Sequence, residues 1–339
     1  MNLPDWVEEI RPQQKEAVDV IVKSFDSSGP TRIFQLDAPT GSGKTLIAEL
    51  VRQRLGYRVV YLCSTLALQS QFALDFPYAA VLRGRSNYLT LDSLDRDLTC
   101  ADCVKEKLTY LKCQLPCSSC PPPHCECPPN DCLKQTEEQL HCRWCHPVTS
   151  CPYESAKALA FRSDLVCTNL SYFLNEANFV NRLTYKRDLI IIDEADLIED
   201  ALLHFVTVAV SPRQQKDFGL YPPDRKTVES SWIAWAISAE STVRTLLRRK
   251  PTGEIHSIRR HKSLSRLLDN IKRLNDPDSG LASGNWVYTG YDKGGIEFKP
   301  IRVDSLANDL LWRHCDRWLL MSATTISFAV EADNLGMNQ

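Results

Sequence analysis

The chain has 339 residues, of which 43% are hydrophobic and 24% charged, and its formal net charge at pH 7 is −2. This composition is ordinary for a globular protein, and the length favours two or three domains. The N-terminus lacks the basic segment and apolar run of a signal peptide, and no apolar stretch approaches the roughly 18 residues of a membrane helix, so we expect an intracellular protein, cytoplasmic or, in a eukaryote, nuclear.

Short apolar segments alternate with helical patterns along much of the chain. The segment 31–38 is a strand pattern that ends at a glycine loop, and 45–55 follows it with helical spacing. A second strand is predicted at 58–65, a helix at 66–76, and further strands at 188–196 and 316–325. Strands that alternate with helices predict an α/β fold built on a parallel sheet.

Two stretches interrupt this alternation. Residues 89–163 are rich in cysteine and proline, with eleven of the fourteen cysteines between Cys100 and Cys151. This segment is too poor in aliphatic residues to bury a core unaided, so it needs a metal or is disordered. The other three cysteines, at positions 63, 167 and 315, lie in apolar stretches and are expected to be buried.

The second interruption, residues 205–300, is helical and basic. Helical spacing is clear at 232–249 and 263–274, and 285–303 resembles two strands around a turn at 293–295. Ten Lys/Arg residues fall between Arg244 and Arg273, against Glu254 and Asp269. This run is either an ordinary solvated surface or part of a nucleic-acid channel.

The sequence APTGSGKT at 38–45 has the spacing of a phosphate-binding loop, between a predicted strand and a predicted helix. Glycines allow backbone N–H groups to face phosphate oxygens at the positive end of a helix dipole. Lys44 would supply a charge to the β/γ-phosphates, and Thr45 a hydroxyl to Mg²⁺. We expect the triphosphate of ATP to contact the loop residues Thr40, Gly41, Ser42, Gly43, Lys44 and Thr45.

Asp193 and Glu194 end the strand pattern LIIID, beyond the phosphate-binding loop. Asp193 would hold Mg²⁺, and Glu194 would orient and deprotonate the attacking water, since hydrolysis needs a base in line with the γ-phosphate. Gln14, in RPQQ, could pair with adenine through its amide, or Pro12 could simply begin a helix there.

These motifs resemble the superfamily 2 helicases of the XPD/DinG type. The resemblance is carried, in the order typical of that family, by RPQQ (11–14), APTGSGKT (38–45), CSTLALQSQF (63–72), RGRSNY (83–88), CPYESAKALAFRSDLVCTNLSYFL (151–174), DEAD (193–196) and MSATT (321–325).

The family resemblance implies a RecA-like first motor domain with two insertions, a Cys-rich iron–sulfur domain and a mainly helical arch. The corresponding ranges are 1–88 for the first part of the motor domain, 89–163 for the iron–sulfur domain, 164–204 for the second motor part, 205–300 for the arch and 301–339 for the last motor part. Ser322 and Thr324 would transmit the nucleotide state from Asp196 to the DNA grip.

The family holds a 4Fe-4S cluster with four cysteines, the last of which matches Cys151. The family's first ligand position is Thr90 here, and a neutral hydroxyl does not ordinarily replace a thiolate on iron. Cys100 or Cys103 would then supply that ligand, and Cys142 with Cys145 is the expected middle pair, with Cys113 as an alternative. The ligand set we expect for the cluster is Cys103, Cys142, Cys145 and Cys151.

Zinc is the alternative metal for this segment. Two C-x2-C pairs form a zinc site as readily as a cluster site, and the pattern occurs at 100/103, 117/120 and 142/145. Both metals, or neither, stay open as well.

The resemblance also implies a path for single-stranded or forked DNA and a 5′→3′ polarity. The residues suited to contact nucleic acid are Thr65, Gln69, Arg83, Arg85, Asn87 and Tyr88. The family's second motor domain has no counterpart in these residues, so we expect a longer chain or a second polypeptide to supply it. The leading hypothesis is the N-terminal half of an ATP-dependent 5′→3′ DNA helicase. The alternatives are a nucleic-acid-binding module with impaired ATPase and an ATPase that acts on protein partners.

Overall fold

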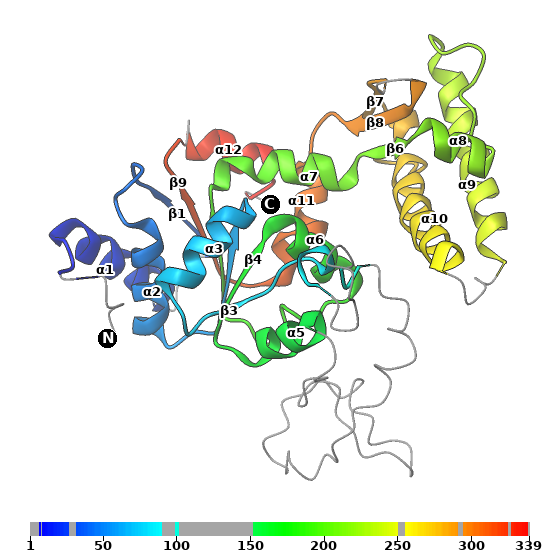
Figure 1. Cartoon of the computed structure of the whole chain (residues 1–339). Helices are drawn as coiled ribbons and strands as arrows, with labels where there is room; N and C mark the ends of the chain where they lie inside the picture. Colours follow the sequence, from blue (N-terminus) through cyan, green and yellow to red (C-terminus); the bar gives the residue numbers. More distant parts are fainter. Residues whose placement is uncertain are drawn as a thin grey trace, which may run out of the picture. The chain divides into compact units, whose positions relative to one another are not determined.

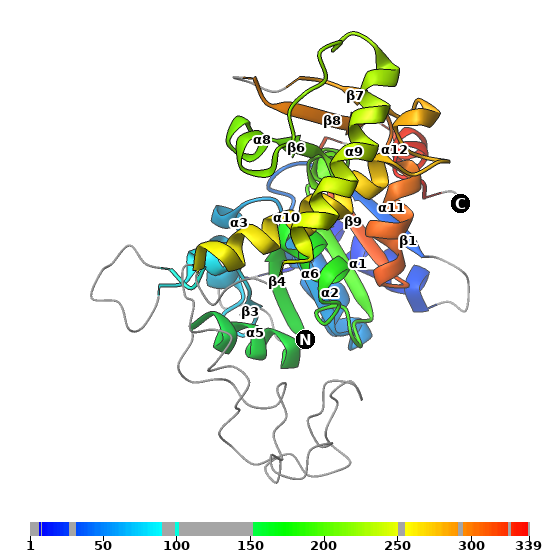
Figure 2. The same cartoon turned by 90° about the vertical axis from the view of Figure 1, so that its right-hand side faces the viewer.

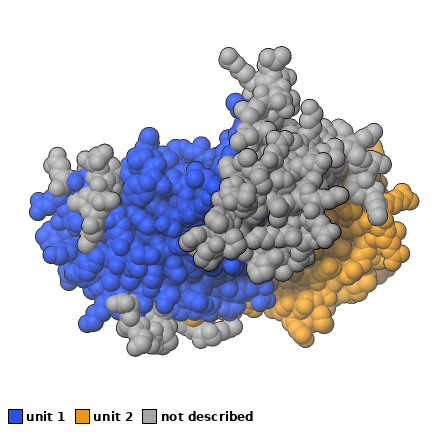
Figure 3. Space-filling model, turned by 90° about the horizontal axis from the view of Figure 1, so that it is seen from below, with its two compact units in different colours: residues 1–198, 308–332 blue, residues 199–307, 333–339 orange. Residues whose placement is uncertain are grey.

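The computed structural model describes residue 7 and residues 9–26, 32–89, 99–101, 152–249, 255–290, 294–324 and 327–337 (Figures 1 and 2). Contacts divide the chain into two compact units. Unit 1 lies within residues 1–198 and 308–332, and unit 2 within residues 199–307 and 333–339 (Figure 3).

Unit 1 is built on a six-stranded sheet in which every neighbouring pair is parallel. In spatial order the strands are β1 (Ile33–Asp37), β9 (Trp318–Ser322), β5 (Leu189–Asp193), β2 (Val59–Cys63), β4 (Leu165–Asn169) and β3 (Ala80–Val81). β1 and β9 are neighbours in the sheet, although most of the sequence lies between them. Their residues pair from Ile33 with Trp318 to Asp37 with Ser322.

One helix precedes the first strand of this sheet, and the next four connect its strands. They are α1 (Pro12–Asp26), α2 (Lys44–Leu55), α3 (Leu66–Asp75), α5 (Pro152–Arg162) and α6 (Leu170–Phe179). Three more helices contain residues of both units, namely α7 (Ile198–Val206), α11 (Asp304–Leu310) and α12 (Phe328–Asn334). Of these elements, α1 packs against α2, and α5 packs against β3.

The central strands are apolar up to their carboxyl ends, as in a parallel sheet that is covered on both faces. All five residues of β2 and all five of β9 are buried, as are Leu189 to Ile192 of β5. The predicted α/β class with a parallel sheet is therefore confirmed. The predicted strands at 31–38, 58–65, 188–196 and 316–325 are all present, each shorter than predicted, and β3 and β4 were not predicted as strands.

Unit 2 combines helices with a small antiparallel sheet. Its helices are α8 (Pro212–Phe218), α9 (Glu229–Leu247) and α10 (Ile255–Leu274), and α9 packs along α10. The sheet has the order β6 (Val208–Val210), β8 (Ile296–Pro300), β7 (Trp286–Tyr288). The predicted pairing of β7 with β8 is confirmed as antiparallel, while β6 was not predicted.

The core of unit 2 is aromatic. The Trp232 ring stacks on Tyr288 with centroids 4.3 Å apart, and Trp235 stacks on Phe298 at 5.7 Å. The apolar face of α10 is buried as its spacing predicts, with Leu264, Leu267 and Ile271 almost inaccessible to solvent. The small sheet therefore gives α9 an apolar surface to pack on, which the helical pattern alone did not reveal. No helix in the described part of the chain is long and apolar enough to cross a membrane.

Candidate functional site

The phosphate-binding loop lies where β1 ends and α2 begins. Gly41 and Gly43 adopt left-handed backbone angles, with φ of 79° and 84°. Gly43 is the N-cap of α2, and no side chain caps this helix end. The first N–H groups of α2 therefore remain available to an anion, in the conformation that favours glycine. Thr40 is exposed at the loop surface.

The side chains of Lys44 and Ser42 have polar groups that are suited to bind phosphate. The Lys44 ammonium donates to the carbonyl oxygens of Ala38, at 2.9 Å, and Pro39, at 3.4 Å, so it lies across its own loop. The Ser42 hydroxyl is buried and has no hydrogen-bond partner among the described residues. An unsatisfied buried hydroxyl costs free energy, and a phosphate oxygen would relieve it.

Gln14 ties the start of α1 to the phosphate-binding loop. Its Oε1 accepts a hydrogen bond from the Arg11 backbone N–H at 3.0 Å, and its Nε2 donates to the Ser42 carbonyl at 2.8 Å. An amide oxygen has a second lone pair and an amide nitrogen a second hydrogen, so each end keeps one position for a ligand. Pairing of Gln14 with adenine therefore stays a prediction.

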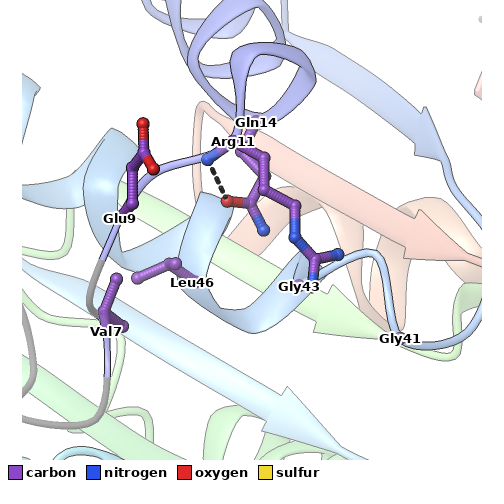
Figure 4. A pocket seen from close by; sticks show the side chains of 7 residues that line it. All are labelled: Val7, Glu9, Arg11, Gln14, Gly41, Gly43 and Leu46. Atoms are coloured by element: carbon purple, nitrogen blue, oxygen red, sulfur yellow. Dashed lines mark hydrogen bonds between the residues drawn. The ribbon is translucent and has the colours of Figure 1, made fainter.

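A pocket of about 490 Å³ opens beside Gln14 (Figure 4). It lies between the segment that precedes α1 and the start of α2, and its lining is Val7, Glu9, Arg11, Gln14, Gly41, Gly43 and Leu46. The pocket adjoins the loop glycines, as a base or ribose site would. The sequence singled out Arg11 only as part of the RPQQ motif, and it gave no site role to Glu9 or Leu46, because only the folded chain brings these residues to one pocket.

Asp193 and Glu194 lie at the carboxyl end of β5. Asp193 Oδ2 accepts from the Tyr61 hydroxyl at 2.8 Å, and Oδ1 accepts from the Glu194 backbone N–H at 3.1 Å. Burial raises the pKa of Asp193 above its ordinary value, although both hydrogen bonds and the charge of Lys44 act to lower it. Glu194 has a left-handed backbone with φ of 57°, and its carboxylate accepts a hydrogen bond from the Ser64 hydroxyl.

Thr45 and Asp193 are suitable magnesium ligands. The Tyr61 hydroxyl lies 3.5 Å from Thr45 Oγ1 and 2.8 Å from Asp193 Oδ2, so a single atom contacts both side chains. Hydroxyl and carboxylate oxygens are the donors that Mg²⁺ prefers, together with phosphate and water. The donor set therefore fits the cation that a bound nucleotide would bring.

Asp196 links the end of the DEAD segment to β9. The hydroxyls of Ser322 and Thr324 donate to its two carboxylate oxygens at 2.7 and 2.9 Å. Burial alone would raise the pKa of Asp196, but these hydrogen bonds lower it. The Ser322 carbonyl accepts from the Ala38 N–H at 3.0 Å, so β9 also contacts the phosphate-binding loop.

The residues predicted to contact nucleic acid differ in their exposure to solvent. Thr65 is exposed and caps α3, because its hydroxyl accepts from the Leu68 N–H at 3.2 Å. Gln69 is fully buried, and its Nε2 donates to the Leu82 carbonyl at 3.4 Å. The predicted contact of Gln69 with nucleic acid has no support in this conformation, because its side chain has no solvent-facing surface.

The segment 83–88 is held by polar and aromatic contacts. Arg83 donates to Ser70 at 2.8 Å, and Arg85 donates to Glu154 at 3.0 Å. The Arg85 guanidinium also lies 4.4 Å from the centre of the Tyr153 ring. Asn87 is exposed, and the Tyr88 ring meets Tyr153 edge-on. These contacts bring the segment against α5 of unit 1.

The proposed metal ligands Cys103, Cys142, Cys145 and Cys151 lie outside the described residues, as does Thr90. Cys100 is described and buried, and its N–H donates to the Tyr88 carbonyl at 2.7 Å. Among the residues that the structure covers, no group of three possible ligands could hold a metal ion. Cys63, Cys167 and Cys315 are buried, as predicted.

Two protein families match consecutive parts of the chain. Residues 8–90 match the family described as type III restriction enzyme, res subunit, and residues 99–214 match the family DEAD_2. Together with the order of the motifs, the two matches support an assignment to the N-terminal half of an XPD-like superfamily 2 helicase. It supports a RecA-like fold for unit 1 and a helicase-type, ATP-using protein at the family level.

Solved structures with similar folds carry XPD in their titles. They are titled "XPD_Helicase", "Structure of S. tokodaii Xpd4" and "XPD_APO", with identities of 15%, 14% and 14% and TM-scores of 0.48, 0.44 and 0.42. The alignments cover 97%, 93% and 96% of this chain but only 61%, 57% and 56% of those chains. The chain therefore spans about three fifths of their length. No curated protein matches it.

Sequence reasoning missed two residues of the site, Tyr61 and Ser64. Tyr61 and Ser64 both fell within the strand predicted at 58–65, and neither was given a role there. Both become visible only when β2 is paired with β5, because that pairing brings their hydroxyls to the carboxylates of Asp193 and Glu194. A tyrosine inside an otherwise aliphatic strand is the one signal that the sequence offered.

Proposed function

We propose that this chain is the ATP-binding and ATP-hydrolysing half of a 5′→3′ DNA helicase that couples hydrolysis to translocation on single-stranded or forked DNA. One observation carries the proposal. The hydroxyl of Thr45, on the phosphate-binding loop, and the carboxylate of Asp193, on β5, both contact the Tyr61 hydroxyl, at 3.5 and 2.8 Å. The loop and the acidic strand end thus meet at a single place, as a nucleotide-hydrolysing site requires.

The triphosphate would bind in the loop between β1 and α2. Its oxygens would accept from the first N–H groups of α2, from the Ser42 hydroxyl and from Lys44, and the positive end of the helix dipole would add to the attraction. Lys44 would exchange the carbonyls of Ala38 and Pro39 for the β/γ-phosphate oxygens. That exchange favours binding because a hydrogen bond between two charged groups is stronger than one to a neutral carbonyl.

Hydrolysis would depend on the two acids at the end of β5. Mg²⁺, held through Thr45 and Asp193, supplies charge neutralisation on the β- and γ-phosphates when it is bound. Glu194 would accept a proton from the attacking water, and the Ser64 hydroxyl would keep its carboxylate oriented. Glu194 has its left-handed backbone at this point, which is costly for a residue with a side chain and is typical of functional sites.

Coupling to DNA would run through Asp196. Its carboxylate is held by Ser322 and Thr324, and Ser322 also contacts the phosphate-binding loop through its carbonyl. A movement of the loop on nucleotide binding would therefore change the position of the residues that follow β9. The proposed DNA contacts in unit 1 are the exposed Thr65 together with Arg83, Arg85, Asn87 and Tyr88.

The basic residues of unit 2 are the second proposed nucleic-acid surface. Two of the ten basic residues form ion pairs within unit 2. Arg244 pairs with Glu240 at 2.6 Å, and Lys272 pairs with Asp269 at 3.7 Å. Arg248, Arg249 and Arg266 are exposed. If they contact phosphates, binding should weaken steeply as salt is raised, because each contact releases condensed counterions.

The Cys-rich segment is proposed to hold a 4Fe-4S cluster on Cys103, Cys142, Cys145 and Cys151, with zinc as the alternative. This proposal rests on the cysteine pattern and the family resemblance alone. Absorption near about 400 nm in anaerobically purified protein would support the cluster, since thiolate-bound iron absorbs there. A colourless protein with stoichiometric zinc would support the alternative.

A second motor domain, from a longer chain or another polypeptide, is proposed to complete the site and supply an arginine finger, which is worth orders of magnitude in rate. We therefore expect this chain alone to bind ATP but to hydrolyse it slowly. The test compares nucleotide binding and ATP hydrolysis by the wild-type chain, Lys44→Ala and Glu194→Gln, with and without single-stranded DNA.

Wild-type binding that is lost in Lys44→Ala, and hydrolysis that is lost in Glu194→Gln while binding remains, would support the proposal. DNA binding by all three proteins without any nucleotide binding would instead favour the nucleic-acid-binding module. An ATPase that single-stranded DNA never stimulates, even with the missing half added, would contradict the helicase assignment.

A further inference from the structure

Tyr61 is a buried polar residue that the proposed hydrolysis does not use. It lies in the middle of β2, its side chain is almost inaccessible, and Ile191 of β5 is its register partner. Its hydroxyl lies 2.8 Å from Asp193 Oδ2, at the carboxyl end of β5, and 3.5 Å from Thr45 Oγ1. A tyrosine whose hydroxyl contacts two polar side chains in an apolar core requires an explanation beyond packing.

The Tyr61 hydroxyl donates a hydrogen bond to Asp193 Oδ2. A phenol carries its proton at neutral pH, so it is a donor to an ionised carboxylate. A phenol has one hydrogen to donate, and the shorter contact, to the carboxylate, takes it. The contact with Thr45 Oγ1 is longer, at 3.5 Å, and it places the Thr45 hydroxyl beside the phenol oxygen.

Two donors fix the plane of the Asp193 carboxylate. Tyr61 donates to Oδ2, and the backbone N–H of Glu194 donates to Oδ1 at 3.1 Å. Each oxygen still has a lone pair that no hydrogen bond in the described structure uses, so the carboxylate is oriented without being blocked.

The Tyr61 ring is itself held in place. Its centroid lies 4.5 Å from that of Phe72 on α3, and Phe72 packs on Phe76 at 4.8 Å. All three side chains are buried in the core of unit 1. A ring packed in this way cannot swing its hydroxyl away, so the two contacts of the hydroxyl are part of the fold and precede any ligand.

We propose that Tyr61 is a positioning residue that orients both oxygen donors of the divalent-cation site, the Asp193 carboxylate and the Thr45 hydroxyl. The inference deepens the proposed function and rests on it. Tyr61 would touch neither the nucleotide nor the cation, so its removal should weaken the cation's contribution to nucleotide binding and leave cation-free binding unchanged.

The test is Tyr61→Phe, which removes only the hydroxyl and keeps the ring in its packing. Tyr78→Phe is the matched control. The Tyr78 hydroxyl also donates to a carboxylate, that of Glu49, at 2.8 Å, but Glu49 belongs to a cluster with Arg52 outside the nucleotide site. Both variants therefore lose a phenol–carboxylate hydrogen bond in unit 1, and only one of them loses it beside the proposed cation ligands.

The measurement is binding of a fluorescent ATP analogue, first in EDTA and then across a Mg²⁺ titration. Loss of a partner that orients a metal ligand typically lowers metal affinity by about 10- to 100-fold. We expect the Mg²⁺ concentration at half-saturation to rise by about tenfold or more in Tyr61→Phe, with the EDTA dissociation constant unchanged. Tyr78→Phe should match the wild type in both measurements.

A second variant separates positioning from general loosening. In an Asp193→Asn background, Tyr61→Phe should produce a much smaller further shift, because the carboxylate is gone and only the longer contact, with Thr45, remains for Tyr61 to act through. The EDTA measurement also reports whether each variant keeps its folded site.

Three results would overturn the inference. The first is a Tyr61→Phe half-saturation within twofold of the wild type, and the second is a loss of affinity in EDTA as large as the loss in Mg²⁺. The third is a wild-type chain whose nucleotide binding ignores Mg²⁺, which would overturn the proposed function along with the inference. The first two leave nucleotide binding, and hence the proposed function, intact.

Discussion

Gly43→Ala is the substitution whose cost the structure defines best. Gly43 has a φ of 84°, and a Cβ built on it would overlap the Gln14 side-chain nitrogen. A left-handed backbone costs a residue with a side chain about 1–2 kcal/mol. Gln14 cannot move away freely, because its amide is nearly buried and makes hydrogen bonds of 2.8 and 3.0 Å.

Displacing the Gln14 amide would break one or both of these bonds, at about 1 kcal/mol each. We therefore expect Gly43→Ala to lower the free energy of unfolding by about 2–4 kcal/mol. The control is Gly56→Ala at the end of α2, where φ is 67° and nothing lies within 4 Å of the added Cβ. Only the backbone term acts there, so the expected loss is about 1–2 kcal/mol.

The assay is urea unfolding followed by circular dichroism, with nucleotide binding measured on the same proteins. Gly56→Ala should bind nucleotide like the wild type, and Gly43→Ala should not. In a Gln14→Ala background the amide is absent, so Gly43→Ala should cost only its backbone term, which gives a coupling of about 1–2 kcal/mol between the two positions. Equal losses for Gly43→Ala and Gly56→Ala, or strict additivity with Gln14→Ala, would refute this reasoning.

Three other predictions concern Lys44, Ser322 and His314. Lys44→Ala should reduce nucleotide affinity at least about tenfold while leaving the unfolding midpoint nearly unchanged, since its partners are loop carbonyls, and a parallel fall in stability would contradict this. Ser322→Ala removes a donor to Asp196 and an acceptor for the Thr324 N–H, so stimulation of the ATPase by DNA should fall more than the basal rate, in a comparison of the two rates. Burial, with help from Arg313, lowers the pKa of His314 from 6.5 to about 4, so the unfolded chain binds more protons between these values. The free energy of unfolding should therefore fall as pH drops from 6.5 toward 4, and urea titrations at several pH values should show a shallower fall in His314→Gln; equal slopes would exclude His314 as the cause.

The strands of unit 1 were predictable where they are buried on both faces. Residues 188–196 and 316–325 contain continuous apolar runs, and β5 and β9 lie in the interior of the sheet as such runs require. The missed strands carry weaker signals. Ala80–Val81 is only two residues long, and Leu165–Asn169 mixes apolar residues with Thr168 and Asn169, so pairing with β2 determines its structure.

The nucleotide site was predictable to the extent that it is local in sequence. The spacing of Gly41, Gly43, Lys44 and Thr45 defines the loop by itself, since its function depends on consecutive backbone groups. Contacts between segments that are far apart in the sequence could not be predicted from it. Gln14 bonds to Ser42, Tyr61 to Asp193, and Gln69 to the Leu82 carbonyl, and none of these pairs shares a sequence pattern.

The central claim is that the loop before α2 binds a triphosphate opposite the acids at the end of β5. The most direct test is a crystal structure with a non-hydrolysable ATP analogue and Mg²⁺. We predict that Lys44 Nζ leaves the Ala38 carbonyl for a phosphate oxygen, with Thr45 and Asp193 facing the cation and Glu194 facing the γ-phosphate. Nucleotide bound elsewhere, or an occupied loop from which Asp193 and Glu194 point away, would contradict the account.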